Sequence, residues 1–356
     1  MRPKKLVNCR NRLLAALAIA VGFLGLVAGC AGTGAKAKGD PYASFVWPPP
    51  PDEPRIRLQD ILHGRADLET DSGFEKLLFG VSPREKFDWL GKPFGVDYDS
   101  KGRLLVTDPA QSALFRFDRP GRKVDVLGTT GALHLIQPLG LGVGPDGSIY
   151  VADAKLKKVV VFDPEGTLRS AFGREGQLVN PTDAAVNPEG TRLFVADSKA
   201  HRIVVFDLES GAVVLSIGNR GEKEGEFNFP SALTFDRGGN LYIVDQINAR
   251  VQIFSQEGEY LDSFGGQGVA FGNFVRPKDV AIDEAGLVYV TDAALNNIQI
   301  FDSELRLLTF VGAAGAGPGQ FQTIGSVAVR GRDFAAVDQL GRRVQVFRFL
   351  VPKETQ

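Results

Sequence analysis

Six aspartates recur along the chain at nearly constant intervals, and each ends a run of apolar residues. The successive spacings between them are 45, 44, 48, 47 and 46 residues. A carboxylate at the end of an apolar strand can accept hydrogen bonds from nearby backbone amides, or pair with a basic residue five positions on. We therefore expect a structural role for all six, which are Asp108, Asp153, Asp197, Asp245, Asp292 and Asp338.

Basic side chains gather in the segments that follow these aspartates, whereas turns elsewhere in each unit carry acids. A cationic surface of this kind favours an anionic ligand or an acidic partner protein. The alternative is that several of these cations pair with the aspartates and the others are simply solvated. The candidate binding residues are Lys157, Lys158, His201, Arg202, Arg250, Arg342 and Arg343.

Several catalytic classes lack their motifs in this sequence. It contains no Cys-x-x-Cys-His haem attachment motif, no phosphate-binding loop and no nucleophile elbow. The glycine-rich segment 314–319 occupies the same place in its unit as the segments 218–227 and 265–274 do in theirs. We therefore expect a loop there rather than a nucleotide site, and no cofactor.

The elements that position these residues repeat six times after about residue 90. Nine residues after each aspartate a phenylalanine ends a β-branched run, and fifteen or sixteen residues before it a proline opens another strand in five units. Thr323 stands in that place in the sixth unit. Turn sequences such as PDGS at 145–148 separate the strands. Four strands per unit at this period predict the blades of a β-propeller around a central channel, with the candidate cations on one face.

The sixth unit ends after its third strand, near Phe349, so its fourth strand must come from elsewhere. The N-terminal segment LLFG, residues 77–80, matches the fourth-strand endings at 171–173 and 263–265. We expect it to pair with the last blade and close the ring, because closure removes exposed sheet edges.

The segments PKDVAID (277–283) and NARVQIF (248–254), together with the strands that end in the six aspartates, resemble NHL repeats. The resemblance covers roughly residues 77–349 and implies an all-β, six-bladed β-propeller. It says little about function, because the family includes RNA-binding modules, lyases, sensor domains and protein scaffolds.

Two kinds of enzyme resemble this fold, and each requires metal-binding side chains at particular positions of the blades. The lyase that cleaves peptidyl-hydroxyglycine binds zinc through histidines of different blades, but only His201 among the three histidines follows a motif aspartate. Gluconolactonase-like propellers bind a divalent cation through carboxylates at the channel mouth. Asp183 and Asp279 are two candidate ligands at the starts of first strands, where the other blades offer Gly95, Gly140, Ala232 and Gly325.

We therefore expect a non-enzymatic binding or scaffold protein for a protein partner or an anionic ligand, without a resident metal. The alternative is a divalent-cation-dependent hydrolase or lyase of one of the two kinds above. The net charge of −1 falls to about −6 without the five basic residues before Leu13, which argues against general polyanion binding. We expect no nucleic-acid ligand, because RNA-binding modules of the family add stacking aromatics and an exported chain rarely meets RNA.

The first thirty residues predict export. A basic stretch precedes an apolar run, residues 13–29, that is shorter than the ~20 residues a membrane-spanning helix needs. The run ends in LVAGC (26–30), which resembles the lipobox of bacterial lipoproteins; an ordinary signal peptide that contains a cysteine is the alternative. The resemblance implies cleavage before Cys30, its lipidation, and stable anchoring of the chain to a bilayer.

Ala31 follows Cys30, whereas an Asp at this place commonly retains such lipoproteins in the inner membrane. We therefore expect the outer membrane, with the propeller in the periplasm or at the cell surface. Residues 31–55 change from small residues to a proline run, which predicts a flexible tether with a stiff end. The predicted organisation is a signal peptide at 1–29, a lipidated tether at 30–55, a lead-in segment at 56–76, the propeller at 77–350 and a tail at 351–356.

Overall fold

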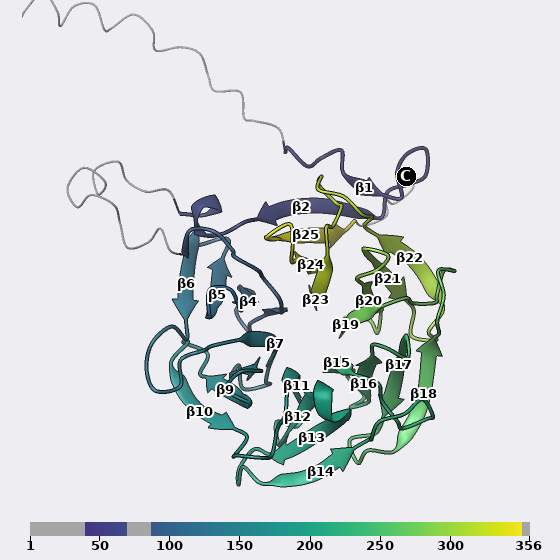
Figure 1. Cartoon of the computed structure of the whole chain (residues 1–356). Coiled ribbons are helices and arrows are strands. Elements are labelled where there is room, and N and C mark those ends of the chain that lie inside the picture. Colours follow the sequence, from purple (N-terminus) through teal and green to yellow (C-terminus); the bar gives the residue numbers. More distant parts are fainter. Residues whose placement is uncertain (1–39, 70–86, 351–356) are drawn as a thin grey trace, which may run out of the picture. The chain divides into compact units, whose positions relative to one another are not determined.

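Short runs of β-branched and aromatic residues, separated by glycine-containing turns, form a ring of antiparallel sheets (Figure 1). The computed structural model describes residues 40–69 and 87–350, and these contain 25 strands in six sheets. The predicted six-bladed β-propeller is confirmed. No helix in these two ranges is long and apolar enough to cross a membrane.

Five blades each use four consecutive strands, whose order runs from the channel to the outer wall. Blade 1 holds β3 (Val96–Tyr98), β4 (Leu104–Asp108), β5 (Ala113–Asp118) and β6 (Lys123–Leu127), and blade 2 holds β7 (Pro138–Val143), β8 (Ile149–Asp153), β9 (Lys158–Phe162) and β10 (Leu168–Phe172). Blade 3 holds β11 (Pro181–Val186), β12 (Arg192–Asp197), β13 (Arg202–Asp207) and β14 (Val213–Ile217). Blade 4 holds β15 (Pro230–Phe235), β16 (Leu241–Asp245), β17 (Arg250–Phe254) and β18 (Tyr260–Gly265), and blade 5 holds β19 (Pro277–Ile282), β20 (Val288–Asp292), β21 (Asn297–Phe301) and β22 (Leu307–Val311).

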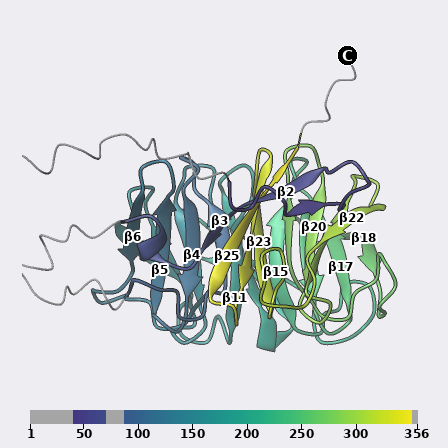
Figure 2. The ribbon, with the colours of Figure 1, turned by 90° about the horizontal axis from the view of Figure 1, so that it is seen from above.

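Blade 6 joins the two ends of the described chain. Its strands are β23 (Ile324–Arg330), β24 (Asp333–Asp338), β25 (Arg343–Phe349), β2 (Ile56–Leu62) and β1 (Val46–Trp47). β2 runs antiparallel to β25, and Figures 1 and 2 show the two strands side by side. The sequence prediction for this closing strand, residues 77–80, is therefore wrong in its position, because β2 takes the place beside β25. Residues 77–80 themselves lie outside the described ranges.

The proline-rich segment before β2 also belongs to the propeller. β1 pairs with β2, and the Trp47 ring meets the Phe347 ring edge-on at 5.6 Å. The predicted tether at 30–55 is thus too long at its C-terminal end, since the compact unit begins at Tyr42. The predicted lead-in segment contributes β2 and a short 3₁₀ helix, η1 (Arg65–Asp67). The predicted signal peptide and tail lie outside the described residues.

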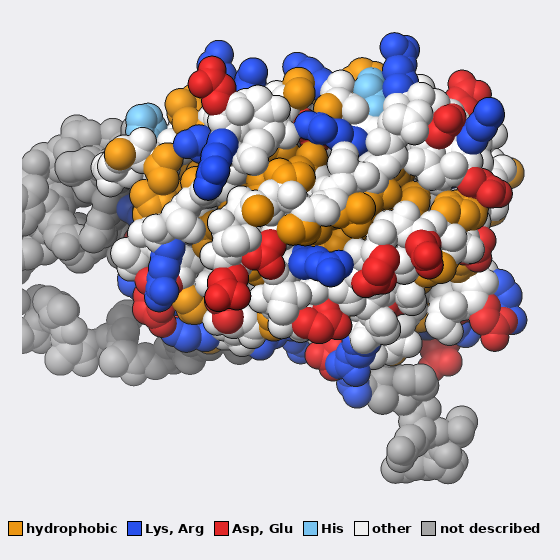
Figure 3. All heavy atoms as spheres, turned by 90° about the horizontal axis from the view of Figure 1, so that it is seen from below, with side chains coloured by type: hydrophobic (Ala, Val, Ile, Leu, Met, Phe, Trp, Pro, Cys, Tyr) orange, Lys and Arg blue, Asp and Glu red, His pale blue; other side chains and the backbone are white. Residues whose placement is uncertain are grey.

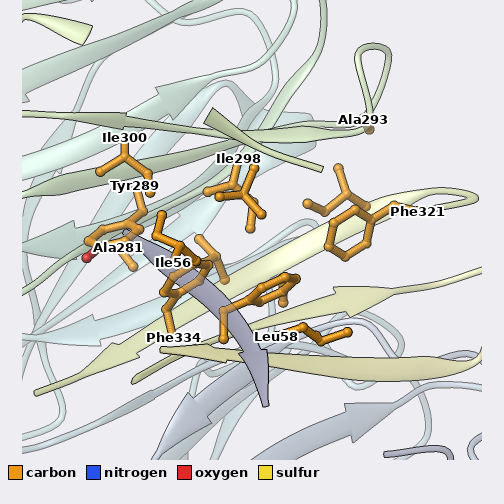
Figure 4. Packing of buried hydrophobic residues seen from close by; sticks show 14 of the residues in the cluster. Ile56, Leu58, Ala281, Tyr289, Ala293, Ile298, Ile300, Phe321 and Phe334 are labelled. Carbon is orange, nitrogen blue, oxygen red and sulfur yellow. The ribbon is translucent and has the colours of Figure 1, made fainter. Parts of the chain in front are cut away.

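The hydrophobic core lies between neighbouring blades. The phenylalanine nine residues after each motif aspartate is at most 2% exposed in all six blades, which are Phe117, Phe162, Phe206, Phe254, Phe301 and Phe347. Figure 4 shows the cluster between blades 5 and 6, where Ile56 and Leu58 of β2 pack against Tyr289 and Phe334. The closing strand therefore completes a core as well as a sheet.

Three buried glutamines hold the inter-blade loops of blades 4, 5 and 6. Gln299 accepts a hydrogen bond from the Gly272 amide at 2.9 Å and donates one to the Asn273 carbonyl at 2.8 Å. Gln252 and Gln345 make the same pair of bonds to their own loops. Apolar residues occupy the equivalent positions of blades 1, 2 and 3, namely Phe115, Val160 and Val204.

Candidate functional site

The motif aspartates are fully buried and accept hydrogen bonds from backbone amides, in four of the blades from two loops. Asp153 accepts hydrogen bonds from the amides of Ile136 and Gln137, which precede β7, and from those of Lys155 and Leu156, which follow β8, at 2.7–3.0 Å. Such a carboxylate ties the start of the first strand to the end of the second. Asp108, Asp292 and Asp338 make both sets of bonds, whereas Asp197 and Asp245 accept amides of the loop before the first strand and pair with an arginine.

Three of the predicted binding cations pair with these aspartates. Arg202, Arg250 and Arg343 lie 3.3, 3.0 and 3.1 Å from the carboxylates five residues before them. The Arg343 side chain is 8% exposed, and it also donates to three carbonyls of the loop before β23. Arg250 and Arg343, at 16% and 8% exposed, offer little charge to a ligand, whereas Arg202 is 32% exposed.

The other predicted cations are differently placed. Lys157 and Arg342 are exposed, Lys158 is half-buried, and His201 lies in a left-handed turn conformation with a φ of 55°. Nδ1 of His201 accepts a hydrogen bond from the Phe229 amide at 3.2 Å, and the two rings pack at 4.6 Å. His201 is therefore engaged with its neighbouring blade.

The segments after the motif aspartates and the inter-blade loops form one side of the ring, which we call the loop face. Exposed apolar side chains lie on it beside the cations. Eight of the thirteen exposed large hydrophobic residues in the described chain lie there, and the other five lie on outer strands. None lies in the turns on the opposite face, the turn face. The eight are Trp89, Ile136, Val179, Phe229, Ile247, Val269, Phe271 and Leu340.

A cavity of about 370 Å³ occupies the channel between the first strands of all six blades. Polar side chains line part of it, including Thr182, Ser231, Gln246, Lys278 and Gln339. Glycines let the strands approach closely here. A Cβ atom on Gly142 would lie 2.3 Å from the Ala184 carbonyl oxygen of the next blade.

Three carboxylates from alternate blades line the cavity: Asp97 of blade 1, Asp183 of blade 3 and Asp279 of blade 5. Each accepts a hydrogen bond from the first strand of the following blade, at 2.9–3.1 Å, from the amides of Val143, Leu233 and Val327 respectively. The three aspartates therefore connect blade 1 with blade 2, blade 3 with blade 4, and blade 5 with blade 6 through hydrogen bonds.

Alignment of the six repeats of this chain identifies Asp183 and Asp279 but misses Asp97. Asp97 lies two residues further along its strand than Asp183 and Asp279 do, so Gly95 stands in their register position. In blade 6 the pairing of Ile324 with Asp338 puts Ser326, and not the predicted Gly325, in that position. A search for any acid within the first strand, rather than at one position, would have found Asp97.

Burial dominates the electrostatics of this cluster. Loss of solvation raises the pKa of Asp97 to about 7 and that of Asp279 to about 6, and it raises the pKa of Asp183 well above its usual value. Repulsion by Asp279 adds to the rise for the other two carboxylates. Burial also lowers the pKa of Lys278 at the edge of the cavity. Within the described ranges, no three His, Cys, Asp or Glu side chains come together in a group that could hold a metal ion.

The raised pKa of Asp97 predicts a pH-dependent penalty on stability. A carboxyl group with a pKa near 7 in the folded chain and near 3.8 when unfolded binds more protons in the folded state, so stability falls as pH rises from about 4 to about 7. Asp97→Asn should remove this contribution. Each pKa unit corresponds to about 1.4 kcal/mol. The free energy of unfolding of the variant should therefore exceed that of wild type by up to a few kcal/mol between pH 5 and pH 8.

Urea unfolding of both chains at a series of pH values measures this difference. Asp302→Asn is the matched control, because hydrogen bonds and Arg306 on the turn face lower the pKa of that carboxyl. A constant difference between Asp97→Asn and wild type across the pH range would contradict the prediction.

One curated protein resembles part of this chain. NHL-repeat-containing protein 4 of Homo sapiens is 32% identical over 73 residues, which are 20% of this chain and 56% of that protein. Over these 73 residues the chain is similar to an NHL-repeat protein. This chain thus spans a little over half the length of its curated relative, and no family model matches it.

Solved structures resemble this propeller across most of its length. Virginiamycin B lyase from Staphylococcus aureus, in a catalytically inactive form with quinupristin, has 15% identity and a TM-score of 0.54, covering 72% of this chain and 80% of that one. A gluconolactonase from Xanthomonas campestris has 16% identity and a TM-score of 0.58, covering 74% and 88%. Kuenenia stuttgartiensis hydrazine synthase has 16% identity and a TM-score of 0.52, covering 74% and 97%. At these identities the likeness shows the propeller fold alone.

Proposed function

We propose that this protein is a membrane-anchored, extracytoplasmic lipoprotein whose NHL propeller is a non-enzymatic platform for a partner protein of acidic character. The observation that supports the platform is the composition of the loop face. It combines eight exposed large hydrophobic residues with exposed lysines and arginines, whereas the turn face has no exposed large hydrophobic residue in the described chain.

The loop face suits a protein interface on physical grounds. Trp89, Ile247 and Leu340 are 57%, 51% and 61% exposed, and large exposed side chains of this kind commonly anchor protein interfaces. Exposed cations stand among them, including Lys155, Lys157, Lys199 and Arg342. The apolar groups would supply affinity, and the cations would steer an acidic partner and set its orientation.

Charge reversal on the loop face tests the proposal. Four substitutions to Glu, at Lys155, Lys157, Lys199 and Arg342, should weaken capture of the partner at least tenfold in quantitative cross-linking from membranes. Wild-type capture should also fall as salt rises, because screening acts over about 8 Å at physiological ionic strength. The paired arginines stay unchanged, so the fold should be intact.

The control reverses four exposed cations on the turn face: Lys101, Arg122, Arg237 and Arg332. This variant should capture the partner as wild type does, with the same melting temperature. Equal capture by both charge-reversed variants, or an equal loss in both, would contradict the assignment of the loop face.

The anchor is tested at the lipobox, which lies outside the described residues. Cys30→Ala should prevent lipidation and leave the unprocessed precursor, because signal cleavage follows acylation of that thiol in lipoproteins. Metabolic labelling with radioactive palmitate and membrane fractionation measure both effects, and Cys9→Ala is the matched control. Labelling of the Cys30→Ala variant would contradict the anchor.

A further inference from the structure

The outer edges of the blades differ in how they are protected. In blade 6, β1 pairs with β2 as a fifth strand, and no strand of the described chain covers the fourth strand of another blade. Charged residues, which discourage pairing, occur in β6, β10 and β18 but not in β14 or β22. Figure 3 shows hydrophobic side chains in a band across the outer wall on the β14 side.

Blade 6 shows how the fold accepts a fifth strand. Trp47 of β1 lies against Phe347 and over Gly319, where an added Cβ atom would lie 2.3 Å from the indole. The Gly319 amide donates a hydrogen bond to Gln345 at 2.7 Å, so the glutamine holds the loop beneath the indole. We call the surface formed by this glycine and phenylalanine the aromatic seat.

Blade 5 repeats the glycine and the glutamine of the aromatic seat, whereas Phe301, its counterpart of Phe347, is covered by Phe264 at 5.1 Å. Gly272 is held by Gln299 in the same way, and no described atom outside residues 271–273 lies within 4 Å of the place that a Cβ atom would take. Phe271 and Phe310 stack beside it at 5.0 Å and are 70% and 40% exposed. In blade 6 the residue equivalent to Phe310 is Ile61, because Ile61 pairs with Gln345 as Phe310 pairs with Gln299. Ile61 is only 7% exposed.

We propose that the edge of β22 is a docking site for an extended, aromatic segment of another protein. The segment adds antiparallel at the N-terminal end of β22, since β1 pairs with the N-terminal end of β2, and it places an aromatic ring over Gly272. Backbone hydrogen bonds supply affinity in this mode, and alternate side chains supply specificity. Leu308, at the β-bulge of β22, and Phe310 are both exposed on this strand, and they contact apolar side chains of the added segment. The site borders the loop face at Phe271 and Gly272, but it does not depend on the proposed function.

A peptide with the sequence of residues 42–53 of this chain is a suitable probe, because it contains the one segment that pairs with an outer strand here. A fluorescein-labelled peptide should bind the mature protein saturably in anisotropy titrations. Leu308→Lys should weaken binding at least tenfold, because a lysine adds charge to the edge. Val214→Lys on β14 is the matched control, since Val214 is 53% and Leu308 55% exposed, and it should leave binding unchanged.

Four results would overturn the proposal. The first is no saturable binding up to about 1 mM, the weak end of specific affinity. The second is an equal loss of peptide binding in the Leu308→Lys and Val214→Lys variants. The third is binding that Gly319→Val abolishes and Leu308→Lys leaves unchanged, which means that the peptide replaces β1. The last is equal binding by a peptide that carries Ala in place of Trp47.

Discussion

Removal of residues 42–62 should abolish folding of the propeller. This segment supplies β2, whose Ile56 and Leu58 are fully buried, and it covers the edge of β25. Burial of one such side chain contributes about 1.5–3 kcal/mol. Loss of the four buried residues of β2 therefore removes an amount similar to the whole stability of a typical domain, about 5–15 kcal/mol. The truncated chain should lack a cooperative thermal transition in circular dichroism.

Two comparisons make this prediction specific. The paired substitution Ile56→Ser and Leu58→Ser should destabilise the ring nearly as much, whereas Gln59→Ser, at a partly exposed position of the same strand, should have little effect. A synthetic peptide of residues 42–62 should restore a cooperative transition when added to the truncated chain. A truncated chain that melts as wild type does would show that the ring closes without β2.

The repeat positions could be predicted from the sequence because they are local and occur six times. The spacing of the aspartates, the phenylalanines nine residues later and the turns between strands each follow from short-range patterns. The closing strand occurs once, and its partner lies almost 300 residues away. A short apolar match such as LLFG at 77–80 carries no information about which edge it meets, and IRLQDIL (56–62) has no repeat with which to align.

The candidate site was predictable to the extent that it follows the repeat. Asp183 and Asp279 share a register position and were found by alignment, whereas Asp97 reaches the same cavity from a different position in its strand. The sequence places these cations after the motif aspartates, but which of them a ligand could reach depends on three-dimensional contacts. Arg343 and Arg342 are neighbours in the chain, yet one is buried in an ion pair and the other is exposed.

The second large effect is expected at a motif aspartate that carries an arginine partner. Asp338 is fully buried, accepts backbone amides from Gln322 and Thr323, and pairs with Arg343 at 3.1 Å. Asp338→Ala leaves this arginine buried without its carboxylate and leaves the amides without an acceptor. Breaking such a buried pair from one side costs about 3–5 kcal/mol. Urea unfolding of the variant should show a loss of this size.

An exposed ion pair provides the control for this loss. Glu284 and Arg237 on the turn face lie 3.2 Å apart with side chains 72% and 71% exposed, so Glu284→Ala should cost no more than about 1 kcal/mol. High salt should shrink the effect of Glu284→Ala and leave that of Asp338→Ala nearly unchanged, because buried pairs are screened less. Similar losses in the two variants would mean that the motif aspartate contributes only surface charge. A large loss confined to Asp338→Ala would show that its carboxylate fixes the loops from which the exposed side chains of the loop face project.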